Sequence, residues 1–460
     1  MSNSFDSVYG RDPRVDPDAG PANPDRKFPD PAYDHGKLLD DHAKYYSREH
    51  WHKEWSRMWC RVWNLAGRTS DVAKVGDWFK FDLGPESFII VRSAPDRIQA
   101  FYNVCHHRGS RIVHQDFGSA TSFVCGFHSW AWNIDGSLKR ITDRESFDEA
   151  LICDNPGLTE VRCEIWGGFV FINMDENAEP LVSFLDVLPD ELEAYNFDDM
   201  MMLKDASVEW PVNWKVGLDA FLEGYHAHSR HPELMNYIDD YHFQHDLWGK
   251  GHSRMIIPMG DKTPRFKDQK KLTAEQAFLL TEVGLDPAEF EGRSGEVRAA
   301  IQARKPEWAA EFGMDYSRFT PSQLSDDWNF SIFPNITLNI HPEGALVMKF
   351  RPHPTDPEIC YYDVWVIGHK VKSSDFKMPA YMTVDDSVDL TGDVPRPDRI
   401  YGRHGEMSMG QVLDQDGDFL PLVQQGVKSQ AYRGVRLSKQ EVRLRHLYAE
   451  YDRWLEGASQ

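Results

Sequence analysis

The chain is poor in cysteine and has no long apolar run, and both deficits limit what it can be. Its six cysteines in 460 residues show no disulfide-framework spacing, which suits a reducing compartment. No stretch approaches the roughly 18 apolar residues of a membrane-spanning helix. The Pro- and Asp-rich start lacks the apolar core of a signal peptide. We therefore expect a flexible arm over residues 1–40 and a cytoplasmic protein with no membrane partner.

Basic residues are also in deficit. Lys and Arg number 51 against 73 Asp and Glu, and the formal net charge is -22. This excess of negative charge argues against nucleic acid as a partner, because a phosphate backbone requires a basic surface. The sequence also lacks a G-x-G-x-x-G stretch after a predicted strand, the fingerprint of a dinucleotide-binding unit. The chain therefore offers no nucleotide-binding unit of its own.

Two of the cysteines stand beside histidines at metal-ligand spacing. The stretch NVCHHRGSRIVHQDFGSATSFVCGFHSW contains Cys105 and His107 as C-x-H, and Cys125 and His128 as C-x-x-H. Two thiolates and two imidazoles can close a metal site, and a structural zinc site is one alternative. A zinc finger, however, would place the cysteines together and the histidines together. The mixed order fits a [2Fe–2S] cluster in which thiolates bind one iron and neutral imidazoles bind the other.

This stretch closely resembles the Rieske motif, C-x-H-x(15–17)-C-x-x-H. The two loops lack the extra cysteines that respiratory Rieske proteins join as a disulfide, so the resemblance is to the Rieske domains of soluble oxygenases and ferredoxins. Gly126 stands where the oxygenases more often have proline, but it is not one of the ligands. Short β runs over residues 77–174, separated by Gly and Asp/Asn turns, predict a small all-β domain that carries the cluster.

A second set of candidate metal ligands lies in NWKVGLDAFLEGYHAHSRHPEL. His226 and His231 are five residues apart, and Pro232 follows them. Because proline disfavours helical geometry in the residue before it, a helix can end near Arg230 and let His231 curl back beside His226. His228 is a rival, although positions i and i+2 of a helix face apart. Ferrous iron for dioxygen chemistry is held by two histidines and a carboxylate, which leaves open positions.

The segment resembles the iron motif of Rieske non-haem iron oxygenases, N-W-K followed by (D/E)-x-x-H-x-x-x-x-H. Here N-W-K occupies residues 213–215, and Glu223 precedes the two histidines. The family takes its carboxylate from far downstream, where GQVLDQDGDFLPLVQQG aligns Asp416 best, with Asp414 and Asp418 as rivals. The resemblance therefore implies a mononuclear Fe(II) at His226, His231 and Asp416.

Glu223 lies three residues before His226, so a helix would place both side chains on one face. Metal-bound histidines usually donate their second N–H to a carboxylate, which fixes the ring. The resemblance adds that the residue at this position reaches a cluster histidine of a neighbouring subunit, here His107 or His128. It also implies a head-to-tail homotrimer, with or without a small beta subunit.

The resemblance covers residue 45 to the C-terminus and implies an α+β fold. We expect a Rieske domain with its preceding helix at 41–175, and a helix-grip catalytic domain with a curved antiparallel sheet at 176–460. Hydrophobic periodicity predicts an amphipathic helix over SREHWHKEWSRMWCRVWNLAG, whereas 248–330 looks long and irregular. Further helices are predicted near 184–195, 213–228, 273–283 and from 438, and three antiparallel strands within 335–368.

The resemblance implies a terminal oxygenase component that receives electrons from a ferredoxin or flavin reductase and uses dioxygen to hydroxylate an organic substrate. An aromatic substrate is expected first, by dioxygenation or monooxygenation. The alternatives are a quaternary amine, a steroid or a terpenoid. Glu223 departs from the aspartate of many aromatic dioxygenases, and EGYH followed by HP resembles the branch that oxidises quaternary amines. A Rieske electron-transfer protein without oxygenase activity is a further alternative.

Overall fold

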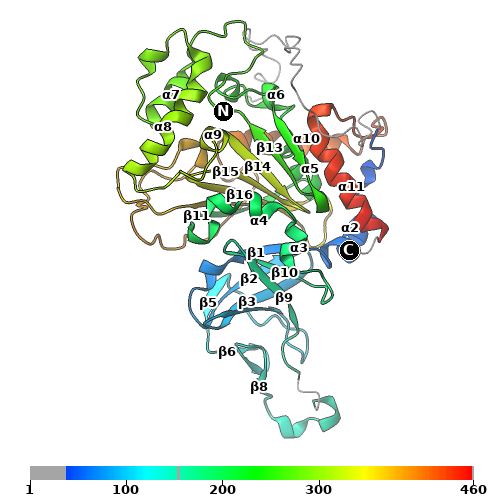
Figure 1. Cartoon of the computed structure of the whole chain (residues 1–460). Coiled ribbons are helices and arrows are strands. Elements are labelled where there is room, and N and C mark those ends of the chain that lie inside the picture. Colours follow the sequence, from blue (N-terminus) through cyan, green and yellow to red (C-terminus); the bar gives the residue numbers. More distant parts are fainter. Residues whose placement is uncertain (1–37, 153–155, 458–460) are drawn as a thin grey trace.

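The computed structural model describes residues 38–152 and 156–457, so nearly all of the predicted N-terminal arm, together with Cys153, lies outside the described residues. A β-rich part lies below a larger mixed part (Figure 1). The five described cysteines are all free, as expected for a chain without a disulfide framework. Among the described residues, no helix combines the length and the apolar character needed to cross a bilayer.

The lower part contains a seven-stranded sheet in the order β1-β10-β9-β4-β3-β2-β5 and a three-stranded sheet, β6-β7-β8, at its far tip. These short strands confirm the β-rich domain that the sequence predicted, and β1 and β10 are buried along their whole length. The large sheet comprises β1 (Asn64–Arg68), β2 (Asp77–Leu83), β3 (Glu86–Ala94), β4 (Arg97–Tyr102), β5 (Phe117–Ser119), β9 (Glu160–Trp166) and β10 (Phe169–Asn173). The small sheet comprises β6 (Ser122–Val124), β7 (Ala131–Asn133) and β8 (Leu138–Arg140).

The upper part is built on a curved eight-stranded sheet in the order β12-β13-β14-β15-β16-β17-β11-β18. Its pairings are antiparallel except at the edge, where β18 runs parallel to β11. The predicted α+β class and the predicted antiparallel run within residues 335–368 are confirmed. The strands are β11 (Met201–Trp210), β12 (Gln244–Leu247), β13 (Ser253–Ile257), β14 (Asp327–Ile332), β15 (Ile336–His341), β16 (Gly344–Pro352), β17 (Cys360–Gly368) and β18 (Ile400–Arg403).

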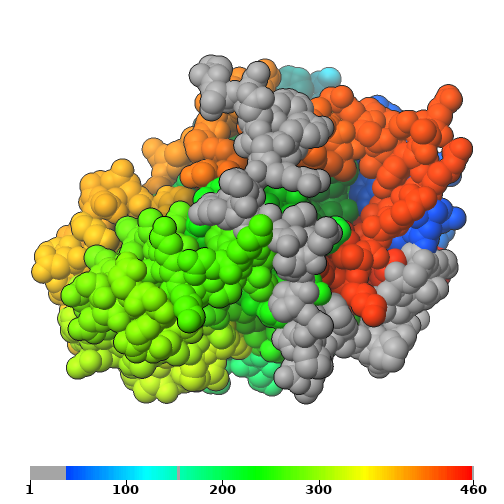
Figure 2. Space-filling view, turned by 90° about the horizontal axis from the view of Figure 1, so that it is seen from above, coloured from blue at the N-terminus to red at the C-terminus, as the bar shows by residue number. Residues whose placement is uncertain are grey.

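Helices cover this sheet, and α5 packs on β16 and β17 with α10 beside it. Seen from above, α7 and α8 lie on one side of the molecule and the C-terminal helices, in red, lie on the other (Figure 2). The helices are α2 (Arg48–Glu54), α3 (Leu181–Leu185), α4 (Leu188–Glu191), α5 (Trp214–Ala220), α6 (Ala227–Arg230), α7 (Ala274–Glu282), α8 (Val297–Glu311), α9 (Pro321–Ser325), α10 (Gln411–Gly426) and α11 (Val442–Glu456).

Two predicted helix starts are confirmed by their capping boxes. The side chain of Thr273 accepts a hydrogen bond from the N–H of Gln276, and Gln276 reaches back to the N–H of Thr273. Ser438 and Glu441 form the same reciprocal pair ahead of α11. These pairs satisfy N–H groups that have no partner within the helix, which is why the local sequence alone places the starts.

Other predicted elements were wrong in their extent. The helix predicted over 213–228 is interrupted between α5 and α6, where a Cβ on Gly224 would lie 1.9 Å from the ring of Phe243. The segment 184–195 divides into α3 and α4 at Asp186, which has φ 53°. The helix predicted from residue 47 passes into a π-turn at Trp55–Trp59 and then into β1. The stretch 248–330 is not irregular, because it forms β13, α7, α8 and α9 and leads into β14.

Charged side chains fix the two parts to each other. Arg68 on β1 donates to the carbonyl oxygens of Phe197 and Met200, and Arg351 on β16 donates to the carbonyl oxygen of Asp82 at 2.7 Å. The buried guanidinium group of Arg68 needs such partners, since an unpaired buried charge is costly. The three-stranded sheet at the tip of the lower part lies at the end of the molecule that is remote from α6 (Figure 1).

Candidate metal centres

The four predicted cluster ligands lie on two loops of matching shape. Two backbone hydrogen bonds close each loop. The N–H of the cysteine, Cys105 or Cys125, donates to the carbonyl oxygen of the fifth residue after it. The N–H of the fourth residue after the cysteine donates to the carbonyl oxygen of the cysteine. That fourth residue, Gly109 in one loop and Ser129 in the other, has a φ of 76° or 60°. Left-handed backbone at this point turns each loop back on itself. Both loops therefore present a cysteine and a histidine at the tip.

The side chains of these loops suit a two-iron cluster. Both cysteines are buried, and the Nδ1 atoms of His107 and His128 lie 3.2 Å apart. The His107 ring stacks on Trp130, with centroids 5.0 Å apart and planes 10° apart. Burial raises the pKa of the Cys125 thiol, but the N–H groups of Phe127 and His128 oppose this and leave the pKa below its usual value. A thiolate facing paired imidazoles is the donor set that a Rieske cluster requires.

Exchange of one cluster imidazole for a thiolate tests this site. His107→Cys is expected to lower the reduction potential of the cluster by on the order of 100 mV or more, because an added thiolate charge stabilises the oxidised form. Redox titration followed by EPR measures the change. The matched control is His106→Cys, whose position falls outside the ligand spacing and whose side chain is exposed. An assembled cluster whose potential is the same in both variants would contradict the assignment.

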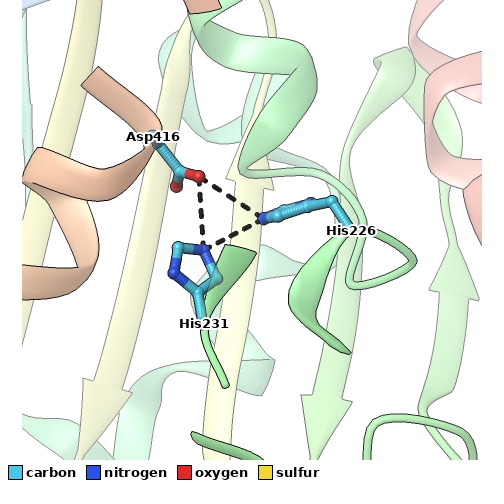
Figure 3. Close-up of side chains that lie close together, drawn as sticks. All are labelled: His226, His231 and Asp416. Carbon is cyan, nitrogen blue, oxygen red and sulfur yellow. Dashed lines mark hydrogen bonds and ion pairs between the residues drawn. The ribbon is translucent and has the colours of Figure 1, made fainter. Parts of the chain in front are cut away.

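The side chains of His226, His231 and Asp416 point toward one another (Figure 3). The Nε2 atoms of the two histidines are 3.2 Å apart. Oδ1 of Asp416 lies 3.2 Å from Nε2 of His231 and 3.7 Å from Nε2 of His226. His226 precedes the single turn of α6, and His231 follows it with non-helical angles (φ −122°, ψ 60°). The chain thus curls back so that both rings face one point, and α10 supplies the carboxylate.

The rival ligands point elsewhere. The acidic stretch is a helix, α10, and residues two positions apart on a helix face different directions. Asp414 accepts hydrogen bonds from the Ser408 hydroxyl and the Met409 N–H at the start of that helix. Asp418 is exposed and lies 3.6 Å from His404. The group of ligand atoms within 4.8 Å of one another contains His226, His231 and Asp416.

A hydrogen-bond partner at Nδ1 fixes the orientation of each histidine ring. Nδ1 of His226 is 2.6 Å from Oε1 of Glu223, and Nδ1 of His231 is 2.6 Å from Oε1 of Gln415. These bonds leave each Nε2 free for a metal. Gln415 was not among the predicted site residues, although its position beside Asp416 on a helix is a signal that could have found it. Glu223 makes the expected contact from a turn between α5 and α6, not from a helical face.

The three groups together favour a positive charge between them. Burial lowers the pKa of His226, but the carboxylates of Glu223 and Asp416 raise it more strongly, to about 9. A site that attracts a proton this strongly also attracts a metal cation, which takes the place of the proton. Two imidazoles and a carboxylate are the donor set of mononuclear non-haem iron.

A cavity of about 310 Å³ lies beside the three groups. Most of its wall is apolar, which suits the organic substrate of an enzyme. One end is polar and comes from β14 and β15. The apolar and aromatic wall includes Phe221, Tyr237, Ile238, Phe243, Met255 and Tyr381, and the polar end comprises Asp327, Asn329, Asn339 and His341.

Comparison with known families matches both parts of the chain. The family described as "Ring hydroxylating alpha subunit (catalytic domain)" matches residues 197–457, and the family described as "Rieske [2Fe-2S] domain" matches residues 62–152. The chain is 30% identical over 373 residues to the carnitine monooxygenase oxygenase subunit of Escherichia coli strain K12, an alignment that covers 80% of this chain and 78% of that protein.

Other relatives match over less of their length. The chain is 30% identical over 177 residues to the glycine betaine monooxygenase oxygenase subunit of Chromohalobacter salexigens, which covers 38% of this chain and 39% of that protein. Among solved structures, a quaternary ammonium Rieske monooxygenase gives a TM-score of 0.62 at 19% identity and covers 91% of this chain and 96% of its own. Naphthalene 1,2-dioxygenase bound to phenanthrene gives 0.62 at 19% identity, with 92% and 93% covered. At these identities the structural matches describe a shared fold.

Proposed function

The chain belongs to the Rieske oxygenases whose catalytic domain is that of ring-hydroxylating alpha subunits, and from this premise we propose that it is a terminal oxygenase that oxidises a quaternary ammonium compound. The aromatic substrate expected first thus gives way to the alternative. The relatives named for carnitine and glycine betaine support this choice. The observation that carries it is the aromatic cavity beside His226, His231 and Asp416, since aromatic rings bind quaternary ammonium groups through cation–π attraction.

The residues of the site have separate proposed roles. Iron held by His226, His231 and Asp416 would supply the activation of dioxygen. Glu223 and Gln415 fix the two imidazole rings, so the open side of the donor set faces the cavity. The apolar wall excludes water, which strengthens electrostatic interactions inside. Glu223 is thereby a positioning residue for His226, with a further proposed role in electron transfer.

Electrons reach this site through the cluster of Cys105, His107, Cys125 and His128. In one chain the tip that carries these residues lies at the end remote from α6 (Figure 1). Electron transfer slows steeply with distance, so we propose a head-to-tail homotrimer in which the cluster of one subunit serves the iron of the next. Inter-subunit electron transfer is described for the structurally similar quaternary ammonium Rieske monooxygenase. A ferredoxin or a flavin reductase is the proposed donor, and a small beta subunit is a further candidate partner.

We also propose the domain division that the sequence predicts, with a Rieske domain at 41–175 and a catalytic domain at 176–460. The large sheet of the lower part ends with β10 at Asn173, and the upper sheet begins with β11 at Met201. The boundary therefore falls between two complete sheets, which is where a domain boundary is expected.

Oxygen consumption tests the substrate class. With both metals loaded and a flavin reductase with NADH as electron donor, dioxygen uptake and aldehyde or amine release are expected with choline, glycine betaine or L-carnitine. Naphthalene and benzoate serve as the aromatic comparison. Uptake that is coupled to product formation for the aromatic compounds, and not for the quaternary amines, would contradict the proposal. Product analysis with labelled dioxygen also distinguishes incorporation of one atom from incorporation of two.

A further inference from the structure

The polar end of the cavity contains a carboxyl group that the iron site does not use. From its surroundings we infer that Asp327 binds the positive charge of the substrate and makes the cavity selective for organic cations. This inference rests on the proposed function and refines it. The Asp327 carboxylate would favour an organic cation over a neutral molecule of the same shape, which an apolar cavity alone would not do.

The hydrogen bonds of Asp327 leave one oxygen free. Oδ2 accepts from Nδ2 of Asn339 at 2.5 Å, whereas Oδ1 is buried without a hydrogen-bond partner among the described residues. The nearest cation-capable group is Nε2 of His341 at 3.7 Å, too far for a hydrogen bond. The side chain is partly buried, 14% exposed, and a buried carboxylate oxygen without a partner is costly unless a positive charge or a proton satisfies it. The side chain lines the substrate cavity, so a ligand can supply that charge.

No neighbouring cation among the described residues forms a hydrogen bond or close ion pair with Asp327, although the charge of Arg443 acts on it from a distance. Burial, with the nearby charge of Lys305, lowers the pKa of His341 to about 3, so this ring is neutral. Arg443 donates to the side chains of Asn329 at 2.8 Å and Ser253 at 2.9 Å. Burial raises the pKa of Asp327 itself to about 7, even though Asn339 and Arg443 lower it. The carboxyl group therefore retains a proton at mildly acidic pH, and an arriving cation would displace that proton.

Aromatic rings from several elements share the cavity with Asp327. Tyr237, Phe243 and Tyr381 line its wall, and the ring of His341 lies 4.3 Å from the ring of Tyr381. A carboxylate combined with aromatic rings recognises a quaternary ammonium group by charge and by cation–π attraction together. The ionisable groups around Asp327 are His341, Arg443, Tyr195, Tyr237, Tyr381 and Asp326, and Asp326 is paired with Arg298.

The test compares choline with dimethylbutanol, its neutral isostere in which carbon replaces nitrogen. Dissociation constants are measured by calorimetry on the holoenzyme. Asp327→Asn keeps the shape of the side chain and removes its charge. Choline affinity is expected to fall about ten- to a hundred-fold, the value of a hydrogen bond or contact to a charged group, while affinity for the isostere changes less than about two-fold. Equal losses for both ligands, or no loss for choline, would overturn the inference.

The matched control is Asp261→Asn. Burial raises the pKa of this carboxyl group to about 6, but Asp261 is not among the residues that line the cavity. Its removal is expected to leave the affinity ratio of choline to isostere unchanged. A wild-type enzyme that oxidises only zwitterionic quaternary amines and ignores choline would overturn the inference and leave the proposed function standing. A wild-type enzyme that oxidises no quaternary amine would overturn both.

A second measurement needs no variant. If Asp327 binds the cation, the affinity of the wild-type protein for choline relative to the isostere rises with pH as this carboxyl group ionises, with a midpoint near its pKa of about 7. The isostere occupies the same cavity, so effects of pH on the shape and hydration of the cavity affect both ligands and cancel in the ratio. A ratio that stays flat between about pH 6 and about pH 8 would overturn the inference even if Asp327→Asn failed to fold.

Discussion

Dioxygen uptake by the His226→Ala variant is expected to fall far below that of the wild type, while the visible spectrum of its cluster stays unchanged. The loss should exceed the roughly 10- to 100-fold typical of removing an outer hydrogen-bond partner of a metal site, because here a ligand itself is removed. Nε2 of His226 is one of the three proposed donor atoms, and no other His, Cys, Asp or Glu of the described residues joins this group. Iron content and oxygen-electrode assays measure the two effects. Activity that survives this change would refute the assignment.

The proposed carboxylate ligand, Asp416, can be tested against two neighbouring carboxylates on the same helix. Asp416→Ala is expected to lose iron and activity together, since Asp416 is buried and lies 3.2 Å from His231. Asp414→Ala and Asp418→Ala should keep iron. Asp414 accepts a hydrogen bond from the N–H of Met409 at the start of α10, and Asp418 is exposed. Comparable iron loss in Asp418→Ala would place the ligand elsewhere on the helix.

Glu223→Gln is expected to slow electron transfer from the reduced cluster to the iron by roughly 10- to 100-fold, while both metal sites still fill. The Glu223 side chain accepts from the N–H of His226 and contacts Nδ1 of its ring at 2.6 Å. Glutamine retains the size of the side chain but removes the charge that would link this ring to a cluster histidine of the neighbouring subunit. Single-turnover stopped-flow measurements at the cluster absorbance report the rate.

Two controls separate this role from a structural one. Gln415→Ala removes the equivalent contact to His231, so it should weaken iron binding without slowing transfer in molecules that retain iron. Sedimentation should show the same oligomer for Glu223→Gln as for the wild type. If Glu223→Gln binds both metals and transfers electrons from cluster to iron at an unchanged rate, Glu223 only orients the His226 ring. An active wild-type monomer would remove the basis for transfer between subunits.

The sequence by itself determined the features that depend on short-range spacing. The predicted cluster ligands lie within two loops, each closed by its own backbone hydrogen bonds, so the spacing of Cys105 to His107 and of Cys125 to His128 already fixes which side chains share a tip. The capping boxes at Thr273 and Ser438 are equally local. Pro232 after His231 predicted where the helix ends, because its restriction acts on the adjacent residue.

Only the tertiary structure decided the features that require distant segments to meet. The resemblance favoured Asp416 by alignment, but its geometric support over its two neighbours comes from the direction in which α10 faces α6, which spacing along the sequence does not give. The contact of Gln415 with His231 joins residues 184 positions apart. The close approach of the Phe243 ring at the break before α6 leaves no room for a side chain at Gly224, and this contact joins segments that are separate in the sequence. The unpartnered Oδ1 of Asp327 results from strand pairing and cavity shape, since burial of an atom away from partners arises only when the chain is packed.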